Sequence, residues 1–211
     1  IQAVASGAGN PAFVSTFTTD AAIFLYPNGG TSYPKISSRL TGATFLETHS
    51  TGTEAASDFT KWDFQTGAGN GGELTSDWNG LLWKRAPGFF DVVAYTGTGS
   101  SSARAVSHNL GVEPEMMWVK RRDADIGTGW AVYHKGIDAT APQDYYLFLN
   151  NTSGRTNSFY RWGDTAPTAT NFYIVEDMDA SGGSFIAYLF ASLPGISKVG
   201  SASHSGTTNV D

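Results

Sequence analysis

The chain has 211 residues, a net charge of −6, and a charged fraction of 15%. Aromatic residues reach 13% and glycine accounts for 25 residues, which is typical of short strands joined by tight turns rather than of helices. The absence of cysteine excludes disulfides and thiolate metal sites, and no apolar run approaches the roughly 18 residues of a membrane helix, so no membrane insertion is expected.

The acidic balance argues against a nucleic-acid partner, because such a partner needs a basic surface that displaces counterions. One basic cluster is present, Lys120-Arg121-Arg122, and it is followed at once by Asp123 and Asp125. We interpret this cluster as a solvated strand end.

Apolar periodicity predicts short strands along the first part of the chain. The expected strands cover residues 13–17, 21–26, 44–49, 62–64 and 78–84. Pro27-Asn28-Gly29-Gly30 indicates a turn after the second of these strands, and residues 67–72 indicate a loop. Residues 54–58 are expected to form one helical turn.

The second part of the chain has a clearer strand pattern. The expected strands cover residues 89–95, 106–110, 116–120, 130–134, 145–149, 172–175 and 185–191. Residues 145–149 are apolar on both faces, which predicts a strand inside a sheet. This density of strands predicts an all-β fold of tandem small antiparallel β-sandwich units, jelly-roll or concanavalin-like, with little or no helix.

A Pro-Gly motif occurs twice, at Pro87-Gly88 and at Pro194-Gly195. Each copy follows an apolar run at the same distance, and the spacing between the copies matches one small domain per repeat. Outside this motif, residues 11–14 can be aligned with residues 114–117. We therefore predict a first, divergent β-sandwich unit without a recognisable first strand at residues 1–87, a second unit at 88–194, and the start of a third unit or a terminal extension at 195–211. On this interpretation the chain is a segment of a larger polypeptide or a processed product.

Several motifs in residues 80–211 carry a family resemblance. They are residues 85–93 with Tyr95-Thr96-Gly97, residues 107–114 with 119–122, and the later stretches 132–135, 162–168 and 188–195. This region resembles a repetitive β-sandwich domain of unknown function that is common in structural proteins of marine tailed bacteriophages. Such domains are found in long virion proteins of tail-fibre or appendage type, often behind a concanavalin-like lectin domain. Residues 1–79 match the pattern weakly.

The resemblance implies a place on the surface of the phage particle, in the tail or an appendage. There the chain would be a segment of a tail fibre that acts as a spacer or a host-surface adhesion element. The alternatives are a carbohydrate-binding adhesin module and a capsid decoration or head-fibre protein. The implied partners are other copies of the chain, by analogy in a homotrimer, other virion proteins and a host cell-surface glycan. The family has no established catalytic residues, so we expect neither enzyme activity nor a cofactor.

Aromatic and polar side chains are interleaved between residues 130 and 162. Their main expected use is in the core or in a subunit interface, because large aromatic side chains bury much apolar surface. Their alternative use is stacking on sugar rings. The candidates for glycan contact are Trp130, Tyr133, Arg155, Tyr160, Arg161 and Trp162. Residues 155–162 are favoured, because binding residues concentrate on loops that a rigid frame holds.

Signals for a metal site are weak, and no metal is expected. Asp177, Asp179 and Ser181 resemble the opening of a calcium loop, but the position that needs a bidentate glutamate is Tyr188. A turn-rich hairpin loop is the better interpretation. The four histidines, His49, His108, His134 and His204, lack metal-ligand spacing. His108 is instead expected to cap a turn through its ring nitrogen.

Overall fold

The computed structural model describes residues 1–5, 7, 9–26, 33–57, 60–70, 78–125 and 127–202. Every strand pairing in these residues is antiparallel. The α-helix α1 (Phe159–Trp162) and the 3-10 helices η2 (Pro142–Asp144) and η3 (Glu176–Met178) are each about one turn long. The prediction of an all-β antiparallel fold with little helix is therefore confirmed. None of the described helices has the length and apolar character needed to cross a membrane.

The described strands fall into two sets of eight. The first set is β1 (Gln2–Ala5), β2 (Phe13–Val14), β3 (Ala21–Leu25), β4 (Lys35–Ser38), β5 (Thr44–Glu47), β6 (Ala55–Ala56), β7 (Gly67–Ala68) and β8 (Asn79–Trp83). The second set is β9 (Phe90–Thr96), β10 (Arg104–Ser107), β11 (Met116–Arg121), β12 (Trp130–His134), β13 (Tyr145–Phe148), β14 (Thr156–Asn157), β15 (Asn171–Ile174) and β16 (Ser184–Phe190).

The second set repeats the strand order of the first. The first six-stranded sheet has the order β1-β8-β3-β4-β5-β6, and β2 pairs with β7. The second sheet has the order β9-β16-β11-β12-β13-β14, and β10 pairs with β15. Adding eight to each label of the first set gives the second set. The two halves of the chain thus have the same sheet topology.

The strand registers match as well. Trp83 at the end of β8 lies opposite Ala21 of β3, and Phe190 at the end of β16 lies opposite Met116 of β11. The separation in sequence between Trp83 and Phe190 is larger than that between Ala21 and Met116. Loops of different length therefore shift the offset from strand to strand. The predicted alignment of residues 11–14 with 114–117 is wrong, because residues 114–117 lead into β11 and match the start of β3.

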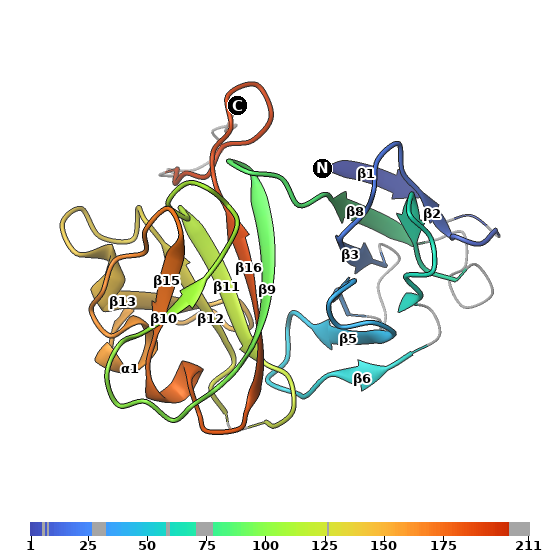
Figure 1. The fold of residues 1–211 in the computed structure, drawn as a ribbon. Helices are drawn as coiled ribbons and strands as arrows, with labels where there is room; N and C mark the ends of the chain where they lie inside the picture. Colours follow the sequence, from blue (N-terminus) through green and yellow to red (C-terminus); the bar gives the residue numbers. More distant parts are fainter. Residues whose placement is uncertain are drawn as a thin grey trace.

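Three apolar clusters separate four layers of sheet (Figure 1). A first outer cluster lies between the pair β2–β7 and the first large sheet, and consists of Ala12, Phe13, Ala22, Phe24, Ala68 and Leu82. A second outer cluster lies between the pair β10–β15 and the second large sheet, and includes Val106, Met117, Val119, Tyr133, Trp162, Phe172, Ile174 and Leu189. A central cluster joins the two large sheets, and includes Ala21, Ile23, Ile36, Leu46, Trp83, Phe89, Phe90, Val92, Trp130, Ile186 and Tyr188.

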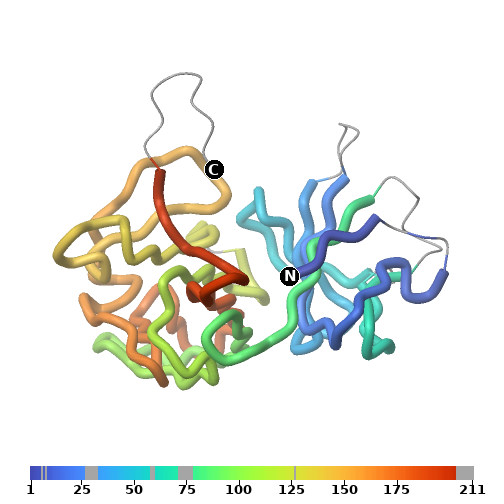
Figure 2. The backbone as a smooth tube through the Cα atoms, turned by 90° about the horizontal axis from the view of Figure 1, so that it is seen from above, coloured from blue at the N-terminus to red at the C-terminus, as the bar shows by residue number. Residues whose placement is uncertain are grey.

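Strand alternation explains how each large sheet serves two clusters. In β3, Ala22 and Phe24 belong to the first outer cluster, whereas Ala21 and Ile23 belong to the central cluster. In β11 the alternate residues divide in the same way. Figure 2 shows the two halves side by side, with the connector from β8 to β9 crossing between them. Both large sheets therefore use matching faces to contact each other.

Both Pro-Gly motifs form the same turn. The Ala86 N–H donates to the backbone oxygen of Phe90 at 2.9 Å, and the Leu193 N–H donates to that of Ser197 at 3.1 Å. The glycines of the two turns have φ values of 74° and 77°, which a residue with a Cβ rarely adopts. The predicted unit boundaries at residues 87–88 and 194–195 lie in these turns.

Most of the longer strand predictions are confirmed, since β3, β5, β8, β11 and β12 lie within or nearly within the predicted ranges. The helical turn predicted from residue 54 is wrong, because Ala55–Ala56 form β6 at the edge of the first sheet. No strand forms at residues 62–64, and the loop predicted from residue 67 contains β7. The turn predicted at residues 27–30 lies outside the described residues.

Candidate functional site

Three of the six candidate glycan residues lie in the core. Trp130, Tyr133 and Trp162 are 0%, 1% and 1% exposed. The indole N–H groups of Trp130 and Trp162 donate to the backbone oxygens of Glu47 and Tyr145, each at 3.0 Å. Tyr133 packs edge-on against Trp162, and burial raises the pKa of Tyr133 to about 12. These rings offer no open face to a sugar, and they serve as core residues.

Arg161 is also buried. Its guanidinium forms an ion pair with Asp177 and lies 4.7 Å from the ring centroid of Tyr146. The Nε atom of Arg161 has no hydrogen-bond partner among the described residues. The ion pair joins α1 to η3, which is a structural role.

Arg155 and Tyr160 are the candidates that reach the surface. Tyr160 is 52% exposed, and the Arg155 side chain is 49% exposed. Arg155 donates to Asp138 Oδ2 at 2.7 Å, and its guanidinium carbon lies 4.5 Å from the ring centroid of Tyr145. Hydrogen bonds from the backbone N–H groups that follow Asp138, and from Arg155, hold the pKa of Asp138 well below its usual value. Arg155 is thus held in place although it is exposed.

Asp179, one of the calcium-loop candidates, ties the loop after β9 to the loop before β16. Its buried carboxylate accepts the N–H and the hydroxyl of Thr98 at 2.9 and 2.8 Å, the N–H of Ser100 at 3.1 Å, and Nε of Arg104 at 2.9 Å. Burial opposes ionisation, but these hydrogen bonds outweigh it and lower the pKa of Asp179. Both carboxylate oxygens are therefore already engaged by donors of the chain.

The side-chain oxygens of the other two calcium-loop candidates, Asp177 and Ser181, do not form a common site with Asp179. Asp177 pairs with Arg161, and Ser181 is exposed. Within the part of the chain that the structure describes, no three histidine, aspartate or glutamate side chains gather closely enough to hold a metal. His204 lies outside the described residues.

His108 caps a turn, as predicted from the sequence. The N–H of Leu110 donates to His108 Nδ1 at 3.2 Å, and His108 Nε2 lies 3.2 Å from the backbone oxygen of Thr168. Burial lowers the pKa of His108.

The prediction of a solvated basic strand end is wrong for Lys120. This side chain is only 1% exposed, because the cluster lies on β11, in the interior of the second sheet. Lys120 Nζ donates to the backbone oxygen of Arg121 at 2.8 Å, and burial lowers the pKa of Lys120. The matching residue of the first sheet is Leu25, since both lie four residues beyond the first matched pair of β3 and β11.

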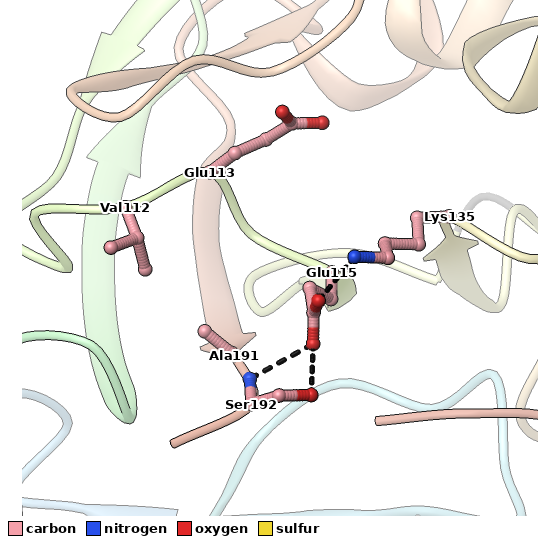
Figure 3. Close-up of a pocket in the computed structure, with 6 residues that line it drawn as sticks. All are labelled: Val112, Glu113, Glu115, Lys135, Ala191 and Ser192. Carbon is pink, nitrogen blue, oxygen red and sulfur yellow. Dashed lines mark hydrogen bonds and ion pairs between the residues drawn. The ribbon is translucent and has the colours of Figure 1, made fainter. Parts of the chain in front are cut away.

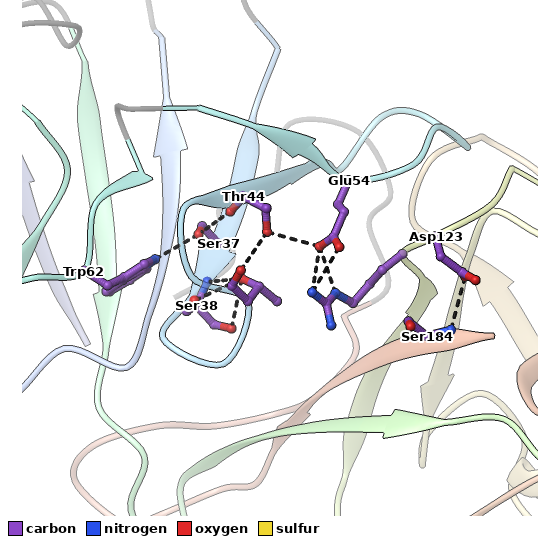
Figure 4. Close-up of polar contacts among 9 residues, drawn as sticks. Ser37, Ser38, Thr44, Glu54, Trp62, Asp123 and Ser184 are labelled. Carbon is purple, nitrogen blue, oxygen red and sulfur yellow. Dashed lines mark hydrogen bonds and ion pairs between the residues drawn. The ribbon is translucent and has the colours of Figure 1, made fainter. Parts of the chain in front are cut away.

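Arg122 reaches across to the first half of the chain. Its Nε and Nη2 donate to the two carboxylate oxygens of Glu54 at 2.9 and 3.1 Å, and the Glu54 N–H donates to the Arg122 backbone oxygen at 2.8 Å. Glu54 also accepts the Thr44 hydroxyl at 3.1 Å (Figure 4). The Tyr188 hydroxyl lies close to this group, and burial raises the pKa of Tyr188. These contacts form a polar bridge between the two halves beside the central cluster.

In each half of the chain, one acid binds the segment that leaves the large sheet. Asp20 Oδ2 accepts the N–H of Arg85 at 2.8 Å, and Glu115 Oε2 accepts the N–H of Ser192 at 2.9 Å. Each acid lies one residue before β3 or β11, and each donor lies two residues after β8 or β16. We call this repeated contact the exit clamp.

Glu115 makes further contacts in the second exit clamp. Its carboxylate also accepts the Ser192 hydroxyl and the Lys135 ammonium group (Figure 3). Burial opposes ionisation of Glu115, but these donors outweigh it and lower the pKa of Glu115. Glu115, Lys135 and Ser192 line a pocket of about 230 Å³, and Glu113 also lines it.

The connector between the two large sheets is fixed at both ends. Arg85 is held to the first half through Asp20, and its Nε donates to Asp91 of β9 at 2.6 Å. The buried Asp91 carboxylate also accepts the N–H of Asn109 at 2.7 Å. Residues 84–89 therefore cannot act as a loose tether.

Sequence reasoning missed Asp20, Asp91, Glu115 and the bridge from Glu54 to Arg122. The available signal for the exit clamp was a single acid directly before an apolar strand in each half, at Asp20 and Glu115. The described residues thus bring together several acids that backbone N–H groups and cationic side chains satisfy, of which Asp91 and Asp179 are buried and Asp20, Glu54 and Glu115 are half-buried. Such an arrangement fixes the relative positions of the loops and strand ends that it joins.

A family profile described as "Domain of unknown function (DUF7483)" matches residues 36–211. No curated protein and no solved structure matches the chain. The matched span begins within β4 and includes strands of both large sheets.

Proposed function

This chain belongs to the DUF7483 family of domains of unknown function, and from that premise we propose that it is a structural building block of a virion. In this proposal it forms two tandem β-sandwich units within a tail fibre or appendage, as a spacer or host-surface adhesion element. The observation that carries the proposal is the repeated strand order of β1–β8 and β9–β16. Tandem repetition of a structural unit is one way in which a chain builds an elongated body, because each unit contacts its neighbour.

Each proposed unit is a small sandwich. A six-stranded sheet faces a two-stranded pair across an outer cluster in both halves of the chain. Packing of sheet on sheet with an apolar layer between them is the arrangement of β-sandwiches. We propose, as expected from the sequence, that each unit is a sandwich of the jelly-roll or concanavalin-like kind.

The pairing of the units favours a stiff spacer. The two large sheets contact each other through matching faces, as in an isologous dimer, and such a contact is closed rather than propagating. The bridge from Glu54 to Arg122 and the connector at Arg85 fix the relative position of the units. A closed and fixed pair transmits force along its connections without bending at the joint.

The place in the virion rests on the sequence resemblance of residues 80–211 to repetitive proteins of tailed bacteriophages. Backbone N–H groups bind the buried acids Asp91 and Asp179 and the half-buried Glu115, which supports a structural rather than a catalytic role. By analogy the fibre would be a homotrimer that contacts other virion proteins.

Immunogold electron microscopy tests this proposal. Antibodies raised against the purified chain are applied to intact particles of the phage that encodes it, and we expect label on a tail fibre or appendage. Label on the capsid would favour the capsid decoration or head-fibre alternative. The absence of label from particles, with the chain present in infected cells, would contradict the virion proposal.

A carbohydrate-binding adhesin module is the second candidate function. The observation in its favour is the exposure of Phe159 and Tyr160 on α1, 39% and 52%, directly after the strand that follows Arg155. We expect binding to a host polysaccharide that Tyr160→Ala and Arg155→Ala reduce, with Tyr33→Ala as a control at an exposed tyrosine of the first half. An array on which the wild-type chain binds no glycan would contradict this function and leave the spacer role standing.

A further inference from the structure

The two units already occupy each other's matching faces, so a larger assembly has to form through a different surface. This inference rests on the proposed building-block function. An apolar groove of about 320 Å³ is lined by residues at the end of β8, at the start of β11, and at and beyond the end of β16. We call it the end groove, and its lining includes Ile1, Trp83, Phe89, Trp118, Phe190 and Ile196.

The floor of the end groove continues the central cluster. Trp83 and Phe89 belong to that cluster, and Trp118 and Phe190 pack against it. The groove is therefore an extension of the interface between the two units, which reaches the surface here. Continuity with a well-packed apolar interface makes its walls rigid rather than adaptable.

The rim of the end groove carries unusually exposed apolar side chains. Ile196, on this rim, is 60% exposed. Val112, 40% exposed, lies on the far side of Ala191, which lines both the end groove and the adjoining pocket. Apolar side chains that gather around a groove mark an interaction surface more strongly than scattered ones do.

The residue that follows the Pro-Gly pair is apolar in both turns, but it is buried in only one of them. Phe89 and Ile196 hold the same position, because each directly follows the Pro-Gly pair of its turn. Phe89 is 8% exposed because it packs in the central cluster, whereas Ile196 is 60% exposed. At this position the first turn buries an apolar side chain between the units, whereas the second turn exposes one to solvent.

Charges on either side of the groove are suited to a self-complementary contact. Lys198 lies on the wall of the end groove, and Glu113 borders the adjoining pocket beyond Ala191. Both are exposed, and among the described residues neither takes part in an ion pair. A two-fold contact over Ala191 places the Glu113 side of one copy against the Lys198 side of the other.

We propose that the end groove binds a second copy of this chain in a two-fold contact, in which the apolar rims around Ile196 pack together and Glu113 faces Lys198 across the interface. The contact joins two closed pairs of units end to end. Because a two-fold contact closes at two copies, it doubles the length of this rigid body and does not continue further.

Sedimentation velocity of the purified chain over a range of concentrations tests the proposal. We expect a reversible monomer–dimer equilibrium for the wild-type chain and a dissociation constant raised about tenfold or more by Ile196→Asp. Val14→Asp is the matched control, because Val14 is 59% exposed but lies on β2, away from the groove. Ile196→Ser, a milder change, is expected to give a smaller shift in the same direction, and circular dichroism verifies that each variant is folded.

Charge reversal tests the two-fold geometry. Glu113→Lys and Lys198→Glu are each expected to weaken the dimer about fivefold, and the double variant is expected to recover wild-type affinity. A chain that remains monomeric at every concentration, or a dimer that Ile196→Asp leaves unchanged, would overturn the proposal. A double variant without recovery would overturn the two-fold arrangement. Dimers without label on virions would instead disprove the proposed function alone, and label with a monomeric chain would disprove this inference alone.

Discussion

Glu115 accepts the backbone N–H of Ser192 at 2.9 Å, one residue before β11 begins and two residues after β16 ends. Asp20 makes the same contact with Arg85 at 2.8 Å in the first half of the chain. An aspartate in the first half and a glutamate in the second thus accept the N–H at equivalent positions. In both halves the chain then continues from the sheet into a Pro-Gly turn. The exit clamp is a repeated structural device, which the sequence repeat alone did not reveal.

The exit clamp gives the first prediction. Glu115→Ala leaves the Ser192 N–H and the Lys135 ammonium without their acceptor, so we expect the free energy of unfolding to fall by about 1–3 kcal/mol. Urea denaturation measures this loss. Glu113→Ala is the matched control in the same pocket, with an expected change within about 0.5 kcal/mol. Equal effects of the two variants would show that the clamp contributes nothing.

The bridge between the two halves gives the second prediction. A double-mutant cycle with Glu54→Gln and Arg122→Leu is expected to give a coupling energy of about 1 kcal/mol or more, because the pair is bidentate and largely buried. The pair Arg121 and Asp123, which is two residues apart and lies within one half, serves as the control. We expect its coupling to be about 0.5 kcal/mol or less. A coupling of the same size in both cycles would contradict a special role of the bridge.

Lys120 gives the third prediction. Replacing this buried ammonium by the residue at the matching position, Lys120→Leu, is expected to raise the free energy of unfolding by on the order of 1 kcal/mol at neutral pH. Burial lowers the folded pKa of Lys120 below its ordinary value of 10.5. Between these two pKa values the unfolded chain binds more protons, so the wild-type chain gains stability as pH rises through this window.

The pH dependence of the variant separates this effect from simple repacking. Lys120→Leu lacks the titrating group, so its advantage over the wild-type chain is expected to shrink as the pH rises toward 10.5. Lys84→Leu, at an exposed lysine, is expected to give a profile parallel to that of the wild-type chain. Chemical denaturation at a series of alkaline pH values measures both. If the free energies of unfolding of Lys120→Leu and the wild-type chain differed by the same amount at every pH, the effect would not come from the buried ammonium of Lys120.

Asp179 gives the fourth prediction. Asp179→Asn removes the charge that Arg104, Thr98 and Ser100 bind, and is expected to cost about 3 kcal/mol at neutral pH. The folded pKa of Asp179 is lowered, so its contribution is present above the ordinary value of 3.8 and is lost as pH falls through the folded pKa. We therefore expect a shallower acid limb for Asp179→Asn in thermal unfolding. An acid limb as steep as that of the wild-type chain, with Asp63→Asn as the exposed control, would count against this role.

The strands that could be predicted from the sequence are those with a long enough alternation of side chains. Trp130–His134 forms β12 over the predicted range, because its apolar residues serve clusters on both faces of the sheet. Two-residue strands such as β6 and β14 have no periodicity to detect, and they form only because a neighbouring edge offers hydrogen bonds. The repeat was visible at the Pro-Gly turns and the apolar runs before them, where the offset between the copies is constant. It was hidden in β3 and β11, where loop lengths change the offset.

The candidate site was harder to predict, because burial is decided by contacts between distant parts of the chain. Tyr160 and Trp162 are two residues apart and look equally suited to stack on a sugar, yet one is 52% and the other 1% exposed. The one-turn helix α1 directs them to opposite sides. Lys120 looked solvated because it begins a basic cluster, but it lies on an interior strand of the second sheet. Composition cannot supply either fact.

Differential scanning calorimetry tests most directly whether the two repeated halves form one module around the central cluster. We predict a single transition in which the calorimetric and van't Hoff enthalpies agree, with Ile36→Ala in the first half lowering the midpoint of that whole transition. Two separate transitions, of which Ile36→Ala shifts only one, would contradict the shared core and the spacer built on it.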